Sequence, residues 1–319
     1  MHENPNPKTN HRWAIPIAFA CVYFFWGSTY TAIKIGTQYL PALFMAGLRF
    51  LISGSLMLIF CRLRGLRIFF SAREMAWLAL FGMLMLGIAN SALIWAEKAL
   101  PSGLAALIVA VVPLYVALLE KILPHGEQLR PRGILGLFLG FLGLGVLVSP
   151  SLRHGLTGQT AQLLAAGSLL IGSLAWAVGS LLSRRAKLPI DVLVAAAWQM
   201  FFAGAVNFTL ALLLGEQHQA QWNRPALYSV AYLVVFGSWV GYTAYVWLIT
   251  HVPVGKVATY AYVNPMVAVL LGFLLLNEHL VPTEYIGMAL VIIAVALVTS
   301  SQIKSKTPRA ELEAEILKT

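Results

Sequence analysis

Long apolar stretches alternate with short polar ones along nearly the whole chain. A helix needs about 20 apolar residues to cross ~30 Å of hydrocarbon, and ten stretches approach that length. A closed barrel would instead show short segments of alternating polarity. Because helices satisfy their own backbone groups in lipid, the pattern predicts an all-α polytopic membrane protein with ten transmembrane helices. We expect them at 13–33, 41–60, 75–96, 101–119, 132–149, 162–183, 193–214, 228–249, 255–276 and 283–301.

The same pattern of residues occurs twice, about 150 positions apart. Trp26 recurs as Trp176 and Gly54 as Gly204, both at a spacing of 150. A second block recurs at a spacing of 152: Trp95, Pro101, Gly103 and Pro113 return as Trp247, Pro253, Gly255 and Pro265. A third recurs at 151: Glu127, Leu129, Pro131 and Gly136 return as Glu278, Leu280, Pro282 and Gly287. Internally repeated membrane chains are typical of secondary transporters, with the substrate site between the repeats.

Five predicted spans in each half fix how the two halves relate to the membrane. Because five is odd, the second half enters the bilayer in the opposite sense, which predicts two inverted five-helix repeats. The expected parts are a tail at 1–12, a first repeat at 13–150, a linker at 151–161, a second repeat at 162–301 and a tail at 302–319. The first apolar run lacks a small-residue cleavage site, so we interpret it as a retained span.

Charge placement predicts the orientation of the protein. Charged residues make up only 11% of the chain, against roughly 25% in soluble domains. With the N-terminus in the cytoplasm, 17 of the 22 Lys and Arg residues fall on the cytoplasmic side. Basic loops stay inside, so we expect a multi-pass protein of the bacterial inner membrane with both termini cytoplasmic. The orientation in the membrane then explains the net charge of +10, so we expect the lipid bilayer, and no nucleic acid, as a partner.

The sequence offers little for catalysis. No catalytic Ser/His/Asp order, zinc spacing or phosphate loop stands out, so we expect neither an enzyme nor a bound cofactor or metal. Cys21 and Cys61 fall within or at the ends of predicted spans and suggest no disulfide.

Several short runs resemble one transporter family. In the first half they are Trp26-Gly27-Ser28-Thr29, Gly47-Leu48-Arg49-Phe50, Pro101-Ser102-Gly103, Pro113 and Gly126-Glu127-Gln128-Leu129. In the second half they are Trp176, Pro253, Tyr262-Val263-Asn264-Pro265, Glu278 and Leu280. In order and in duplicate, from about residue 15 to 301, they resemble the EamA family of the drug/metabolite transporter superfamily. That resemblance implies ten helices, a central cavity and efflux of small metabolites. The chain departs from it at Asn277, where a glycine is expected, and at Gln199, the counterpart of Arg49.

Arg49 is the sharpest candidate for substrate binding. It lies near the middle of the second predicted span, where a charge is costly and should face the bundle interior. Guanidinium groups bind carboxylates through two hydrogen bonds, so Arg49 is a candidate clamp for an anionic group. The alternative is a structural role, and the resemblance favours it, because the family keeps an Arg here with many substrates.

Aromatic and uncharged polar residues inside the spans supply further candidates. Trp26 and Tyr30 lie one turn apart, and amphipathic rings of this kind line cavities for amphipathic solutes. Asn264 is a secondary substrate contact, and we interpret Pro113 and Pro265 as hinges, because proline frees a backbone carbonyl one turn earlier. Polar side chains inside spans also join helices to each other, and that alternative stays open. The remaining candidates for substrate binding are Asn90, Trp176, Gln199, Tyr242, Tyr245 and Tyr260.

The acidic residues all lie at or beyond the ends of the predicted spans. Proton-coupled export of cationic drugs usually uses an embedded carboxylate, so this arrangement disfavours a small multidrug antiporter. Glu97 is near enough to a helix end to be drawn inward. The coupling ion stays open.

We therefore predict an exporter of small metabolites, such as amino acids or related amphipathic compounds, that works by alternating access. One rival is an exchanger of anionic solutes such as sugar phosphates, for which a single embedded Arg is a poor match. Another is a non-transporting scaffold or sensor. Gly136 and Gly140 suit either a homodimer contact or packing inside the bundle, which is the default explanation.

Overall fold

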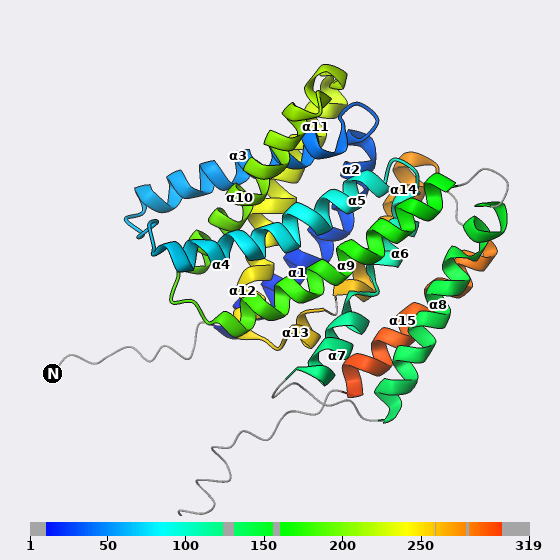
Figure 1. The fold of residues 1–319 in the computed structure, drawn as a ribbon. Helices are drawn as coiled ribbons and strands as arrows, with labels where there is room; N and C mark the ends of the chain where they lie inside the picture. The colour runs from blue at the N-terminus through cyan, green and yellow to red at the C-terminus, as the bar shows by residue number, and fades with distance from the viewer. Residues whose placement is uncertain (1–10, 124–130, 156–159, 259, 279–280, 302–319) are drawn as a thin grey trace, which may run out of the picture.

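The computed structural model describes residues 11–123, 131–155, 160–258, 260–278 and 281–301 (Figure 1). Within these ranges the chain is helical, with no strand. The first half contains α1 (His11–Cys21), η1 (Val22–Trp26), α2 (Gly27–Gly36), α3 (Ala42–Leu63), α4 (Ala72–Gly82), η2 (Met83–Asn90), α5 (Ser91–Ala96), α6 (Ser102–Val109), α7 (Val112–Ile122) and α8 (Pro131–Gly155). The second contains α9 (Thr160–Ala186), α10 (Val192–Leu213), η3 (Glu216–Gln219), α11 (Arg224–Tyr232), η4 (Leu233–Tyr242), α12 (Thr243–His251), α13 (Val254–Val257), α14 (Tyr260–Leu276) and α15 (Pro282–Ser301).

The helices are long and apolar enough for a membrane protein. Among the described residues seven reach membrane-spanning length and hydropathy: Trp13–Gly36, Ala42–Leu63, Ala72–Ala96, Ser102–Ile122, Thr160–Ala186, Val192–Leu213 and Arg224–His251. Shorter apolar stretches, at Pro131–Gly143, Val263–Leu276 and Tyr285–Ala294, fall where the other three spans are expected. The all-α membrane fold is therefore confirmed, and the ten-helix arrangement is compatible with it. α8 continues to Gly155, so the expected linker at 151–161 begins inside a helix.

Several spans are interrupted at matching places. The third and eighth contain the π-helical segments η2 and η4, and a residue spacing of 152 relates their last residues, Asn90 and Tyr242. The first span contains a third such segment, η1, which ends at Trp26. Short π-helical segments inside α-helices frequently mark functional sites. The fourth span is broken between α6 and α7, at Ala110 and Val111.

Glycines let two pairs of helices approach closely. α3 packs along α10, and α8 along α15 (Figure 1). At the first crossing a Cβ on Gly54 would collide with the backbone of Phe201, and one on Gly204 would collide with that of Leu51. The contacts are reciprocal, because 150 positions separate both Gly54 from Gly204 and Leu51 from Phe201. Gly140 packs against Leu114 and Ala294 inside the bundle, as the default explanation expects.

Candidate functional site

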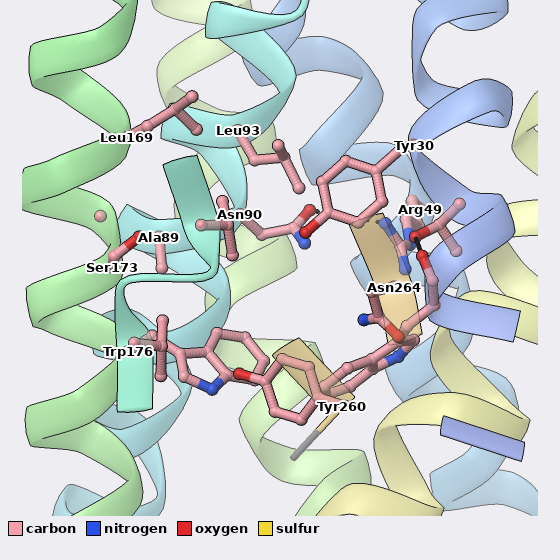
Figure 2. Close-up of a pocket in the computed structure, with 15 residues that line it drawn as sticks. Tyr30, Arg49, Ala89, Asn90, Leu93, Leu169, Ser173, Trp176, Tyr260 and Asn264 are labelled. Carbon is pink, nitrogen blue, oxygen red and sulfur yellow. Dashed lines mark hydrogen bonds between the residues drawn. The ribbon is translucent and has the colours of Figure 1, made fainter. Parts of the chain in front are cut away.

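A cavity of about 70 Å³, the central cavity, lies between the two halves of the chain. Figure 2 shows Trp176 and Tyr260 along one side of it, with Leu93 and Leu169 along the opposite side. Its volume accommodates roughly five water-sized groups. The residues that line it are Trp26, Thr29, Tyr30, Arg49, Ala89, Asn90, Leu93, Val109, Val112, Leu169, Gly172, Ser173, Trp176, Tyr260 and Asn264.

Four rings form an aromatic layer at one side of the central cavity: Trp26, Trp176, Tyr245 and Tyr260. The ring centroid of Trp26 lies 5.4 Å from that of Trp176, with the planes nearly perpendicular at 83°. It lies 4.9 Å from the Tyr245 ring and 5.4 Å from the Tyr260 ring. Trp176 Nε1 donates a hydrogen bond to Tyr245 Oη at 3.0 Å, and Trp26 Nε1 donates one to the carbonyl oxygen of Gly237 at 3.0 Å. Edge-on packing and satisfied N–H groups hold the layer together.

Arg49 brings a positive charge to the central cavity. Only 3% of its surface is exposed, and its Nε donates to Ser238 Oγ at 2.9 Å. Its Nη1 reaches Asn90 Oδ1 at 3.4 Å, and its Cζ lies 4.7 Å from the centroid of the Phe50 ring. A Cβ at Gly237 would lie 2.5 Å from Nη2, so a glycine there makes room for the guanidinium. Among the described residues no carboxylate lies within ion-pair distance of Arg49.

Three further polar side chains face the central cavity. The Ser173 hydroxyl is buried and has no hydrogen-bond partner within the described structure. The Thr29 hydroxyl donates to the carbonyl oxygen of Trp26 at 2.7 Å. The Asn264 amide, with its nitrogen toward the backbone, donates to the Tyr260 carbonyl oxygen at 3.2 Å. Of the three, the Ser173 hydroxyl is the group left to bind a ligand.

Most of the predicted site residues meet at this cavity. Those that line it are Trp26, Tyr30, Arg49, Asn90, Trp176, Tyr260 and Asn264. The other three lie elsewhere. Tyr245 is the fourth ring of the aromatic layer, and Tyr242 Oη donates to Gln199 Oε1. Gln199 lines a second cavity, of about 430 Å³, together with Arg184 and Lys187.

Some lining residues were not predicted although a signal for them existed. Thr29 lies three positions after Trp26, and Ser173 lies three before Trp176. Side chains three or four apart share a helix face, so both follow from the tryptophans. Val109 and Val112 had no such signal, because they reach the cavity only through the break between α6 and α7.

The two predicted hinges lie in different helical settings. Pro113 is in the first turn of α7, directly after the break in the fourth span. Pro265 is inside α14, which continues through it to Leu276. A proline in a first turn loses no helical hydrogen bond, whereas one inside a helix does. Hinge motion at either place stays a prediction.

Equivalent residues of the two halves make equivalent contacts. Lys34 Nζ donates to the carbonyl oxygens of Glu97 and Leu100, at 2.6 and 2.7 Å. Arg184, 150 positions after Lys34, donates to the two carbonyl oxygens that lie 152 positions after those. These acceptors belong to Ile249 and Val252.

A second equivalent pair lies deeper in the bundle. The contact between Arg49 and Asn90 corresponds, at the same spacings of 150 and 152, to that between Gln199 and Tyr242. Arg49 and Asn90 line the central cavity, whereas Gln199 and Tyr242 do not, and Gln199 lines the second cavity. The duplication read from the sequence thus extends to individual hydrogen bonds.

Comparison with known proteins identifies relatives over nearly the whole chain. Two segments, residues 13–149 and 163–300, each match the EamA-like transporter family. The chain is 38% identical over 283 residues to a protein described as the uncharacterized inner membrane transporter YedA, from Escherichia coli (strain K12). That match covers 88% of this chain and 89% of the relative. It agrees with a resemblance to YedA-type transporters that the repeated motifs already carry.

More distant relatives follow the same pattern. The uncharacterized transporter YvbV of Bacillus subtilis (strain 168) is 27% identical over 313 residues, which cover 95% of each chain. One crystal structure superposes with a TM-score of 0.66 at 19% identity and covers 92% of this chain and 100% of its own. At that identity the superposition supports the fold alone.

Proposed function

Because the chain belongs to the EamA-like transporter family, we propose that it is a secondary transporter that exports small metabolites across the bacterial inner membrane. The substrate binds in the central cavity, which opens to one side of the membrane at a time. Both termini face the cytoplasm, so the loops near Gln38 and Lys98 face outward and the loops near Arg64 and Lys187 face inward.

The equivalent contacts of the two halves support an inverted duplication. Lys34 and Arg184 lie at opposite ends of the bundle in this topology, yet each binds carbonyl oxygens of the corresponding segment. Inverted repeats give alternating access a simple basis, because each half takes the conformation that the other had. The central cavity lies between the halves, which is where such a mechanism needs its substrate.

One observation carries the substrate class: Arg49 is buried at the cavity without an acidic partner among the described residues. A buried charge is costly unless another group pairs with it, and a substrate carboxylate supplies that group. The aromatic layer offers an apolar surface nearby, and the Ser173 hydroxyl offers one more hydrogen bond. We therefore propose small amphipathic carboxylates, amino acids among them, as substrates. Larger ones require the lining side chains to move, which alternating access provides.

An exchanger of sugar phosphates fits less well. Phosphate groups carry more charge and are usually held by more than one cation. Arg49 is the one charged residue among the described lining residues.

Transport in liposomes tests the proposal. Purified protein should move a member of a broad panel of amino acids and related carboxylates, and Arg49→Ala should lower that flux by on the order of a hundredfold. Arg73→Ala is the matched control, because Arg73 is exposed in the first turn of α4, away from the cavity. Competition by sugar phosphates but not by amino acids would favour the exchanger. No flux of any solute in the panel would contradict transport and favour a scaffold or sensor.

A further inference from the structure

Glu97 is an acid that the binding site does not use. It directly follows the span Ala72–Ala96, and its side chain is wholly buried, with an exposed fraction of 0%. Neither carboxyl oxygen has a hydrogen-bond partner within the described structure. Its backbone is ordinary, since its N–H donates to the Leu93 carbonyl oxygen at 3.0 Å. The position near a helix end therefore gives no access to water.

A lysine and a second acid lie close to Glu97 without bonding to its carboxyl group. The Lys34 ammonium donates hydrogen bonds to two backbone carbonyl oxygens, those of Glu97 and Leu100. Glu278 has its own donors, because its Oε2 accepts from Ser102 Oγ at 2.5 Å and from Ser102 N at 3.0 Å. Ser102 begins α6, so the Glu278 carboxyl group lies at the N-terminus of that helix. Neither residue therefore makes a hydrogen bond to the carboxyl group of Glu97.

The other helices around Glu97 add few charged or titratable groups. Tyr30 lies on α2, as Lys34 does, and interacts electrostatically with Glu97. Lys98, the next residue in the chain, is exposed. α9 carries its charged residues, Arg184 and Arg185, only at its far end. α3 carries Arg49 in its middle and Arg62 in its last turn, and α6 and α14 carry no charged residue.

A carboxyl group in this setting should hold a proton. Ionising a buried carboxylate that has no hydrogen bond costs several kcal/mol, so the group protonates instead. Burial raises the pKa of the Glu97 carboxyl well above its ordinary value of 4.5. The Lys34 ammonium opposes that shift, and the Glu278 carboxylate adds to it.

The location of Glu97 connects it with access to the cavity. Tyr30 and Leu93 line the central cavity, and Lys34 and Glu97 lie one turn farther along the same two helices. Together with Leu100 and Glu278, these two residues form a layer between the cavity and the loops at that end of the bundle. We call this set the Glu97 layer, and it must separate for the cavity to open there.

We propose that Glu97 is a proton-binding site and that a proton bound to it holds the Glu97 layer closed. The inference rests on the proposed alternating access, and it requires no particular substrate. When the layer opens, water reaches Glu97, which then releases its proton and is free to pair with Lys34. The closed form thus binds more protons than the open form. Closure is therefore favoured at low pH and is lost as the pH rises above 4.5 and through the raised pKa.

Infrared titration of the protein in lipid nanodiscs tests proton binding directly. The protonated-carboxyl band should persist to a pH well above the ordinary range, and Glu97→Gln should remove that part of the band. Glu97→Asp should restore it, which excludes misfolding as the cause. Glu216→Gln is the matched control, since Glu216 already accepts a hydrogen bond from Phe44 N at 2.7 Å, and it should leave the band unchanged. A Glu97 that titrates at its ordinary pKa overturns the proposal.

Thiol labelling tests the closing role. A cysteine replaces Leu93 in a protein with Cys21 and Cys61 changed to alanine, and an impermeant reagent is applied to sealed vesicles of both orientations. From the Glu97 side, labelling corrected for thiol ionisation should rise on the order of tenfold between about pH 5 and about pH 8. With Glu97→Gln it should stay slow at every pH. Equal pH dependence in both proteins, or a response to sodium at fixed pH, overturns the proposal. Failure of the solute panel would count against the proposed function alone, because neither measurement uses a solute.

Discussion

The two ends of the bundle contain equivalent residues, but the side chains at those equivalent positions differ in charge and polarity. At one end Lys34 binds backbone carbonyls beside the buried Glu97. At the other end Arg184 binds the equivalent carbonyls, but the counterpart of Glu97 is the apolar Ile249. The Arg184 end also contains the second cavity, whereas Glu97 and Leu100 of the Glu97 layer are fully buried. The two ends thus share equivalent hydrogen bonds, but only the Lys34 end has a buried carboxyl group at this pair of equivalent positions.

The same contrast holds in the middle of the bundle. The Arg49 and Asn90 pair carries a charge and faces the central cavity. Its equivalent, Gln199 with Tyr242, is neutral and lies outside the central cavity. Alternating access uses one binding site, so equivalent positions in the two halves need different side chains: a charged pair at the site and a neutral pair away from it.

The largest expected effect on stability comes from disrupting the close crossing of α3 and α10, which joins the two halves of the chain. Gly54→Leu should cost more than about 4 kcal/mol or prevent folding, because even a Cβ there meets the backbone of Phe201. Gly167→Leu is the matched control, since nothing lies within 4 Å of a Cβ at that position of α9. Melting temperature and size-exclusion profile in detergent measure the difference. Equal stability of the two variants would contradict the close crossing of α3 and α10.

Removing the cation at each end should produce equal losses of stability but should change access from different sides of the membrane. Lys34→Met and Arg184→Met each remove hydrogen bonds to two carbonyl oxygens, which should lower the free energy of unfolding by about 2 kcal/mol. At low pH, where Glu97 keeps its proton and forms no ion pair with Lys34, Lys34→Met should speed labelling of a cysteine at Leu93 from the Glu97 side, and Arg184→Met should not. If both variants change labelling from the same side, the two ends are not related by inversion.

The two central pairs should differ in their effect on transport. Asn90→Ala removes a hydrogen bond to Arg49 at the cavity, so transport efficiency should fall about tenfold. Gln199→Ala affects the equivalent pair outside the cavity and should change efficiency by less than roughly threefold. Both are measured as flux of the solute that the panel identifies. A larger effect of Gln199→Ala would place the substrate in the second cavity instead.

The smallest expected effect is a difference in how stability depends on pH. The folded, closed protein holds a proton on Glu97 where the unfolded chain has lost it, because the pKa of the buried carboxyl is raised. The parent protein should therefore lose stability relative to Glu97→Gln as the pH rises above 4.5. Melting temperatures of both proteins across a pH series give the comparison. Parallel curves would show that the pKa of Glu97 is the same in the folded protein and in the unfolded chain.

The sequence determined the class of the fold and the duplication. Apolar runs of membrane-spanning length leave helices as the solution that satisfies the backbone in lipid, so the all-α membrane fold followed directly. Repeated landmarks such as Trp26 and Trp176 identified equivalent positions, and seven of the predicted site residues line one cavity. These are properties of local composition and spacing, which a chain carries before it folds.

Only the tertiary structure decided which equivalent residues face the cavity and which face a neighbouring helix. Gln199 and Tyr242 were candidates for substrate binding beside Arg49 and Asn90, but they do not line the central cavity. Glu97 is near a helix end in the sequence, and its burial depends on helices from both halves. Helical spacing specifies one face of one helix, whereas burial and charge pairing depend on what the other helices bring to that face.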